Sequence, residues 1–143
     1  MTRFIGGRPA GGEEVWARIL RYIGHWTALG YGFWAIEEKA SGRFVGEAGF
    51  ADFHRDITPS LTGMPEMGWA LCPWAHRKGY ATEAVRAAVQ WGERHFDSAI
   101  CCIISPGNSA SIRVAEKAGF RELLTTAYHE EPTIIFRRDR PAG

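Results

Sequence analysis

The chain has 143 residues, of which 45% are hydrophobic and 23% are charged, and its formal net charge is +1. This length predicts a single domain over residues 1–143 that buries about two-thirds of its unfolded surface. A nearly neutral charge argues against electrostatically driven binding of nucleic acid. We expect no membrane partner either, because no apolar run approaches the roughly 20 residues of a membrane helix and no signal peptide opens the chain.

The N-terminal part of the chain predicts a loop followed by one helix. Residues 1–12 are rich in glycine and proline, which is typical of a loop. Between residues 13 and 29, apolar side chains recur along one face of a helix, and Gly30 marks its end. The residues on this face are Val15, Ile19, Ile23 and Trp26.

A strand pair is predicted next. Residues 31–38 are rich in aromatic side chains, residues 43–53 form the second strand, and the Ser-Gly pair at 41–42 is typical of a hairpin turn between them. Gly46 and Gly49 inside the second strand predict a bulge or the close approach of another backbone.

A polar loop over residues 54–65 leads into a strand–helix–strand unit. The length of this loop favours a functional role over a mere connection. Residues 66–71 predict a short strand, residues 78–96 an amphipathic helix, and residues 99–104 an apolar strand covered on both faces. Such a unit holds two parallel strands joined by the helix.

The C-terminal part completes an α/β domain with a mixed sheet. A second helix is predicted after Asn108 and ends at Gly119, which suits the position after a helix C-terminus. Residues 121–128 and 133–138 predict a terminal antiparallel pair.

The cysteines indicate a reducing compartment. They are odd in number and have no metal-ligand spacing. Cys101 and Cys102 lie within an apolar run, so buried, reduced thiols are the favoured interpretation for these two, which is a cytoplasmic pattern. The three positions are Cys72, Cys101 and Cys102.

The strand end and turn over residues 68–82 carry the strongest functional pattern. Backbone N–H groups at the start of the following helix lack partners within the helix, and the helix dipole adds about half a positive charge there. Gly79 has no Cβ, so a ligand oxygen can approach the backbone. Arg77 and Lys78 supply positive charge at the rim. The pattern therefore predicts a phosphate-binding turn.

A second pattern lies at residues 108–120, with the sequence Asn-Ser-Ala-Ser-Ile-Arg-Val-Ala-Glu-Lys-Ala-Gly-Phe. With both patterns in view, the chain resembles the GNAT superfamily of acetyl-CoA-dependent N-acetyltransferases, in particular its RimJ/RimL-type branch. The resemblance covers residues 66–120 closely and the preceding segment loosely. It implies the GNAT acyl-CoA N-acyltransferase fold, an α/β fold whose mixed, mostly antiparallel sheet has a parallel βαβ unit at a splayed cofactor cleft.

The resemblance also implies transfer of an acetyl group from acetyl-CoA directly to a primary amine, on a protein N-terminus or a small molecule, without a metal. The turn would bind the pyrophosphate, and the edge of strand 66–71 the pantetheine arm. Asn108 would hydrogen-bond that arm, although an Asn at this place equally favours a helix N-cap. His76 stands where the family more often has Gln or Arg. The implied cofactor-binding residues are Leu71, His76, Arg77, Lys78, Gly79, Tyr80, Ala81, Thr82 and Asn108.

Two residues are implied as catalytic. Glu66 matches the family glutamate beside the thioester and would accept the proton of the amine, whereas a Glu at a strand end is in general more often a surface ion partner. Ser111 would give a proton to the departing thiolate, or is simply a serine of the first helical turn. Many superfamily members use a Tyr at the position of Ala115, which this chain lacks. Backbone N–H groups near Leu71 and Cys72 are the expected donors to the thioester oxygen.

The acceptor groove is expected between the first helix, the strand that contains Trp34, and the loop over residues 54–65. Four aromatic residues either line this groove or belong to the core, namely Trp26, Trp34, Phe53 and Trp69. Three polar residues either meet a cationic amine there or are simply solvated, namely Asp52, His54 and Asp56.

Two further expectations concern partners and activity. Family members usually carry a strand and a helix before the segment that matches residues 13–29, and this chain resembles them only from the junction after those elements. The uncovered sheet edge predicts a homodimer or a domain-completing partner. The alternative to an active enzyme is a non-catalytic acyl-CoA-binding or interaction module. A nucleotide-binding P-loop is disfavoured because the Gly-x-x-x-x-Gly-Lys-Ser/Thr pattern is missing.

Overall fold

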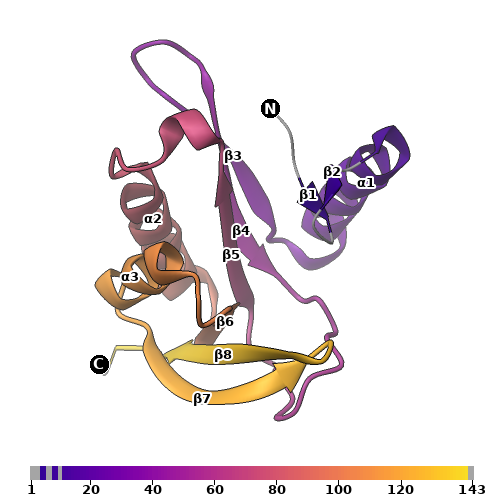
Figure 1. The fold of residues 1–143 in the computed structure, drawn as a ribbon, viewed down its shortest axis with the longest axis vertical. Helices are drawn as coiled ribbons and strands as arrows, with labels where there is room; N and C mark the ends of the chain where they lie inside the picture. The colour runs from indigo at the N-terminus through magenta and orange to yellow at the C-terminus, as the bar shows by residue number, and fades with distance from the viewer. Residues whose placement is uncertain (1–3, 6–7, 10, 142–143) are drawn as a thin grey trace.

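The computed structural model describes residues 4–5, 8–9 and 11–141, and its main feature is a six-stranded mixed sheet. The strand order is β3-β4-β5-β6-β8-β7, with a parallel β5–β6 pair and antiparallel neighbours elsewhere. Figure 1 shows α2 and α3 on one face of this sheet and α1 on the other. The expected fold class is confirmed.

The elements are β1 (Phe4–Ile5), β2 (Arg8–Pro9), α1 (Gly12–Leu29), β3 (Phe33–Glu37), β4 (Phe44–Ala51), β5 (Glu66–Leu71), a 3-10 turn (Pro73–Ala75), α2 (Tyr80–His95), β6 (Ile100–Ile104), α3 (Ser109–Lys117), β7 (Arg121–Tyr128) and β8 (Glu131–Arg138).

Several predicted boundaries differ by one or two residues, and two of the differences have a clear local reason. The loop predicted over residues 1–12 contains an antiparallel ribbon of β1 and β2, whose two-residue strands are too short to produce a periodic pattern. The rest of that prediction, at 1–3, 6–7 and 10, lies outside the described residues. Helix α2 begins at Tyr80, two residues later than predicted, because Gly79 has a φ of 80° and this left-handed conformation does not continue a helix.

The predicted hairpin of β3 and β4 is confirmed, and Gly42 adopts a φ of 72° in its turn. Both glycines of β4 lie against another backbone. A Cβ built on Gly46 would lie 2.2 Å from the Ala70 oxygen, and one built on Gly49 would lie 2.3 Å from the Gly32 oxygen. The prediction of close approach is therefore confirmed at both positions.

Hydrophobic clusters lie on both faces of the sheet. The main one is on the side of α2 and α3, and its largest fully buried side chains are Phe50, Met67, Phe120 and Phe136. The second lies where the loop between β4 and β5 brings Ile57 and Leu61 against Cys101. Cys102 belongs to the main cluster, because successive residues of a strand point to opposite faces. All three cysteines are buried and free, which confirms the prediction made for Cys101 and Cys102.

Helix α1 packs less deeply than its sequence predicts. None of its residues is buried, and Ile19 and Ile23 on the predicted apolar face are 45% and 60% exposed. The contact to the sheet includes Trp26, whose indole N–H donates to the Phe33 oxygen at 2.8 Å. An apolar stripe of α1 therefore faces outward. Within the described part of the chain, no helix combines the length and apolarity needed to cross a bilayer.

Candidate active site

The turn between β5 and α2 is open at the start of the helix. Arg77 and Gly79 have positive φ values of 62° and 80°, which bend the chain into Tyr80, the first residue of α2. No side chain caps this end of α2, and a Cβ built on Gly79 would meet no atom within 4 Å. The first N–H groups of α2 therefore have no side-chain acceptor, and the positive end of the helix dipole beside Gly79 favours an anion.

Two side chains of this turn contact the protein itself. The Nε2 atom of His76 lies 3.0 Å from the oxygen of Leu71, so the ring N–H donates to the end of β5. The Tyr80 hydroxyl donates to a carboxylate oxygen of Glu38, and this hydrogen bond lowers the pKa of Glu38 and raises the pKa of Tyr80. These bonds fasten the turn, while its two basic side chains are exposed.

Strands β5 and β6 meet at one end and then separate. Among the described residues, Glu66 and Cys101 are the single pair in register, and the Cys101 N–H donates to the Pro65 oxygen at 3.1 Å. Beyond this pair, the facing edges of the two strands carry backbone groups that the β5–β6 ladder does not use. The splay that the resemblance implies is therefore present.

The loop after β6 places Asn108 and Ser111 at the start of α3. The Oδ1 atom of Asn108 accepts a hydrogen bond from the Ser111 N–H at 3.2 Å, so Asn108 is the N-cap of this helix. The cap uses the side-chain oxygen and not the amide NH2 group. Ser111 is half-buried in the first helical turn. The N-cap interpretation is confirmed, and a cofactor contact of Asn108 stays a prediction.

Glu66 is a buried carboxylate at the point where β5 and β6 meet. It is 5% exposed, and Arg55 holds both of its oxygens, with Nε 2.7 Å from Oε1 and Nη2 2.8 Å from Oε2. The Nη1 atom of Arg55 donates to the Tyr128 hydroxyl at 3.1 Å. Burial raises the pKa of the Glu66 carboxyl, and the hydrogen bonds and charge of Arg55 oppose that rise. Glu66 is thus an ion partner, but in a buried pair and not at the surface.

The α1 side of the sheet carries aromatic and acidic side chains. Tyr22 of α1 stacks on Phe33 of β3 with ring centres 5.2 Å apart, and its hydroxyl donates to Oε1 of Glu47 at 3.0 Å. The Phe33 ring lies 6.4 Å from that of Phe53. Phe53 and Trp26 are the predicted groove residues that the structure places beside this surface, Trp26 through its bond to the Phe33 oxygen.

The other candidates for the acceptor groove are distributed differently. Trp34 and Trp69 pack against the main core, so the core interpretation holds for both. His54 and Asp52 are exposed and contact each other, with 3.0 Å between Nε2 and Oδ2, and Asp56 is exposed. The structure therefore does not gather these aromatic and polar residues around one groove.

The chain is similar to known proteins over most of its length. The sequence profile of the family described as Acetyltransferase (GNAT) domain matches residues 1–121. The chain belongs to the GNAT acetyltransferase family. The uncharacterized protein YkkB of Bacillus subtilis is 36% identical to it over 113 residues, which are 76% of this chain and 63% of YkkB. A Bordetella pertussis protein assigned to the GnaT-family acetyltransferases matches with a TM-score of 0.87 at 28% identity, over 96% of this chain and 83% of that chain.

More distant GNAT structures share the fold. An aminoglycoside acetyltransferase solved with coenzyme A and kanamycin matches with a TM-score of 0.63 at 21% identity, over 80% of this chain and 70% of that one. The chain spans less than two-thirds of the length of the curated relatives it matches, 63% of one and 52% of another. GNAT acetyltransferases use acetyl-CoA. In the described ranges of this chain, no group of three or more His, Cys, Asp or Glu residues could hold a metal ion.

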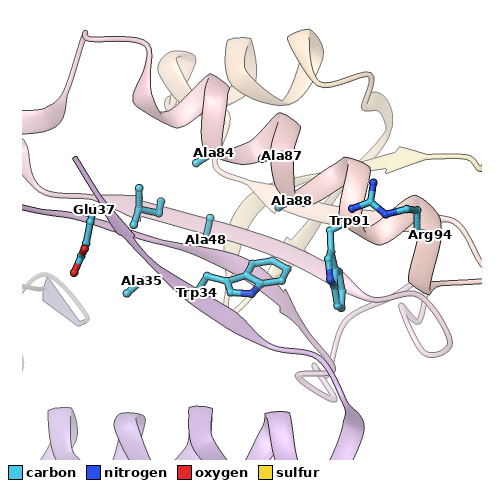
Figure 2. Close-up of a pocket in the computed structure, with 10 residues that line it drawn as sticks. Trp34, Ala35, Glu37, Ala48, Ala84, Ala87, Ala88, Trp91 and Arg94 are labelled. Atoms are coloured by element: carbon cyan, nitrogen blue, oxygen red, sulfur yellow. The ribbon is translucent and has the colours of Figure 1, made fainter. Parts of the chain in front are cut away.

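A pocket of about 460 Å³ lies at the β3 edge of this GNAT fold. Figure 2 shows Trp34 of β3 and Trp91 of α2 lining it, with Glu37 and Arg94 toward opposite ends. Its lining comes from β3, β4 and α2, and the cofactor-binding candidates are not part of it. The pocket is therefore separate from the splay between β5 and β6.

Sequence reasoning misses Arg55 and Tyr128. Arg55 lies 11 residues before Glu66 and 73 residues before Tyr128, so no motif spacing connects the three. The one available indication is the position of Arg55 within a polar loop long enough to be functional.

Proposed function

We propose that this chain is an acetyl-CoA-dependent N-acetyltransferase that moves the acetyl group directly to a primary amine, on a protein N-terminus or a small molecule. One observation carries the proposal, which is that the open helix start at Gly79 follows a strand, β5, whose edge is free where it leaves β6. Such a turn suits a pyrophosphate, and a free strand edge suits the amides of an extended arm. Membership of the GNAT family supports acetyl transfer as the chemistry.

We assign cofactor binding to the turn, the end of β5 and the start of α3. In this proposal the first N–H groups of α2 bind the pyrophosphate, and Arg77 and Lys78 balance its charge. The backbone of Leu71 and the amide NH2 group of Asn108 bind the pantetheine arm. His76, Tyr80, Ala81 and Thr82 shape the turn.

The reaction forms a C–N bond between the amine and the acetyl carbon and breaks the C–S bond of the thioester. In this proposal Glu66 accepts the proton that the amine gives up, and Ser111 supplies the proton that the departing thiolate takes. Arg55 occupies two of the lone-pair positions of the Glu66 carboxylate, which leaves two for the amine or a water molecule. The Cys72 N–H already donates to the Val45 oxygen at 2.8 Å, so the N–H of Leu71 is the donor that we propose for the oxyanion.

We further propose that the chain belongs to the RimJ/RimL-type branch, on the basis of the pattern over residues 66–120. Residues 1–143 would form one GNAT domain, with neither nucleic acid nor membrane as partner. The free, buried cysteines support a cytoplasmic location.

A second copy of this chain is the partner we propose for the edge of β3. This strand ends the sheet, the pocket of about 460 Å³ lies beside it, and Trp16 on α1 is 63% exposed. Glu37 and Arg94 stand toward opposite ends of the pocket (Figure 2), so a two-fold axis at the edge would bring each Glu37 near the Arg94 of the other copy. A monomeric mass in light scattering at micromolar concentration would contradict this proposal.

An acetylation assay with a panel of amines tests the proposed function. The purified protein is mixed with acetyl-CoA and with peptides that begin with Ala or Ser, free amino acids, polyamines or aminoglycosides, and thiol release is recorded. Turnover of any of these amines supports the enzyme. Binding of acetyl-CoA without turnover of any amine supports the alternative, a non-catalytic acyl-CoA-binding module. Neither binding nor turnover would contradict both.

A further inference from the structure

Glu66, Arg55 and Tyr128 form a network that joins three separate parts of the chain. Glu66 begins β5, Arg55 lies in the loop between β4 and β5, and Tyr128 ends β7. The Arg55 side chain is 24% exposed and that of Glu66 7%, so water screens the ion pair poorly. The guanidinium also lies over the rings of Phe53 and Tyr128, 4.5 Å and 5.4 Å from their centres. These contacts fix both the position and the plane of Arg55.

Because water is largely excluded from Glu66, the ionisation of its carboxyl depends on the neighbouring Arg55. A buried carboxyl without a counter-ion takes up a proton instead of remaining charged. Burial raises the pKa of Glu66, and Arg55 supplies the opposing hydrogen bonds and charge. The paired geometry, with one nitrogen on each oxygen, is the strong form of this interaction.

The other titratable groups around Glu66 offer no equivalent charge. Arg137 of β8 is in register with Cys101, but its guanidinium binds the Asp139 carboxylate at 2.7 Å. Cys101 of β6 is neutral at ordinary pH, because burial raises the pKa of its thiol to about 12. The Tyr128 hydroxyl is bonded to the guanidinium. Asp52 and His54 line the same small cavity as Glu66 but contact each other, with 3.0 Å between Nε2 of His54 and Oδ2 of Asp52. Arg55 is therefore the group that determines the charge of Glu66.

We propose that Arg55, supported by Tyr128, is a positioning residue that keeps Glu66 ionised and holds its carboxylate where β5 and β6 separate. The consequence for turnover rests on the proposed function, in which Glu66 accepts the proton of the amine. The consequence for the ionisation of Glu66 does not, and it can be measured without any substrate.

The first experiment titrates Glu66 directly. Carboxyl carbon NMR of protein labelled at Glu reports the ionisation of each side chain, and Glu66→Gln identifies the resonance of Glu66. Arg55→Met should move the titration midpoint of Glu66 upward by at least about one pH unit. Arg55→Lys, which keeps the charge but not the paired geometry, should move it by less. Arg121→Met is the matched control, because Arg121 is exposed on β7 and should leave the midpoint unchanged.

An unchanged midpoint in Arg55→Met with a native circular dichroism spectrum would overturn the proposal. If Arg55→Met does not fold, Arg55→Gln replaces it as a neutral variant that retains a hydrogen-bond donor, with the same expected shift and the same contrary result. Tyr128→Phe keeps the ring under the guanidinium and removes the hydroxyl, so its upward shift should be the smallest of the network variants.

A second experiment links the network to turnover. With an amine that is acetylated, the acid limb of kcat/KM against pH should move upward in Arg55→Met, while acetyl-CoA affinity is unchanged. Full turnover by Glu66→Gln would contradict the assignment of Glu66 as the general base. It would not change what the NMR titration says about the ionisation of Glu66. Glu66→Gln could lose turnover while Arg55→Met moves neither the NMR titration midpoint of Glu66 nor the acid limb of kcat/KM. That result would contradict the positioning role of Arg55 and leave Glu66 as the proposed base.

Discussion

The turn at the start of α2 and the buried network at Glu66 are built in opposite ways. The turn is a continuous, mostly exposed stretch at residues 76–82 that offers backbone groups around the left-handed Gly79. The network joins Arg55, Glu66 and Tyr128 from three elements and offers one shielded charge. The turn therefore acts through the shape of the main chain, and the network acts through an ionisable group that depends on its neighbours.

This difference determines how each region should respond to substitution. Backbone N–H groups remain in place after most side-chain changes, so the turn should fail mainly when a side chain fills the space at Gly79. A buried ion pair should fail when either partner is removed, because the remaining charge is left uncompensated. Five experiments test this difference between the turn and the network.

The largest effect is expected at Glu66. Glu66→Gln keeps the size of the side chain and an acceptor oxygen but takes no proton, so turnover should fall about 10²–10⁴-fold. Because Glu66→Gln also leaves the Arg55 guanidinium uncompensated, the comparison requires a native circular dichroism spectrum. In the folded variant acetyl-CoA affinity should stay the same, because the cofactor candidates lie elsewhere. Thiol-release kinetics and calorimetry measure the two quantities, with the exposed Glu131→Gln as control. Wild-type turnover in Glu66→Gln would remove Glu66 from the mechanism.

The next effect concerns stability and its dependence on pH. Arg55→Met leaves the Glu66 carboxylate without its counter-ion and should lower the free energy of unfolding by about 3–5 kcal/mol at neutral pH. Burial raises the native pKa of Glu66, so the native state holds this proton more tightly than the unfolded chain does. The corresponding stability is present below the unfolded pKa of about 4.3 and is lost as the pH rises through the native pKa.

Urea unfolding between about pH 4.5 and about pH 7.5 checks this sign. The deficit of Arg55→Met relative to the wild type should grow as the pH rises. A deficit that is equal at both ends of the range would mean that Arg55 stabilises by packing and not by charge.

A smaller effect is expected at Asn108, where both functions of one side chain can be separated. Asn108→Ala removes the N-cap of α3 and should cost about 1 kcal/mol of stability. Asn108→Ser retains a capping oxygen but has no amide NH2 group. We expect Ser to restore the stability but not the acetyl-CoA affinity. Wild-type affinity in Asn108→Ser would limit Asn108 to its capping role.

The smallest effect is expected for chemical modification of the Cys101 and Cys102 thiols on β6. Burial raises the pKa of Cys101 to about 12 and raises the pKa of Cys102 as well, so both thiols are protonated and shielded. Iodoacetamide at mildly alkaline pH should leave both unmodified in the native protein and alkylate both in urea, as read by mass spectrometry. Native-state alkylation of Cys101 would show that solvent reaches the buried side chains beside Glu66.

The turn is more predictable from sequence than the network, for a physical reason. Residues 76–82 are neighbours in the chain, so their spacing is visible directly. Helix α2 begins two residues later than predicted, because the left-handed conformation of Gly79 cannot be read from the sequence pattern. Glu66 is predicted because it lies within the family pattern. Arg55 is not, because only the folded path of the loop between β4 and β5 brings its side chain to Glu66.

Helix α1 shows a second limit of periodicity. The spacing of Ile19 and Ile23 shows correctly that the two share a face, but not whether another element covers that face. Trp34 and Trp69 illustrate the same point, because aromatic residues at strand spacing fit a groove as well as a core, and the tertiary packing decides.

Calorimetric titration with acetyl-CoA is the direct test of the α2 turn as the cofactor site. We expect the wild-type protein to bind acetyl-CoA and Gly79→Glu to lose at least about 100-fold in affinity. Gly24→Glu, at an open position on α1, should keep the wild-type affinity. No binding by the wild-type protein at millimolar acetyl-CoA, or equal affinity in Gly79→Glu, would contradict the assignment of the α2 turn as the cofactor site.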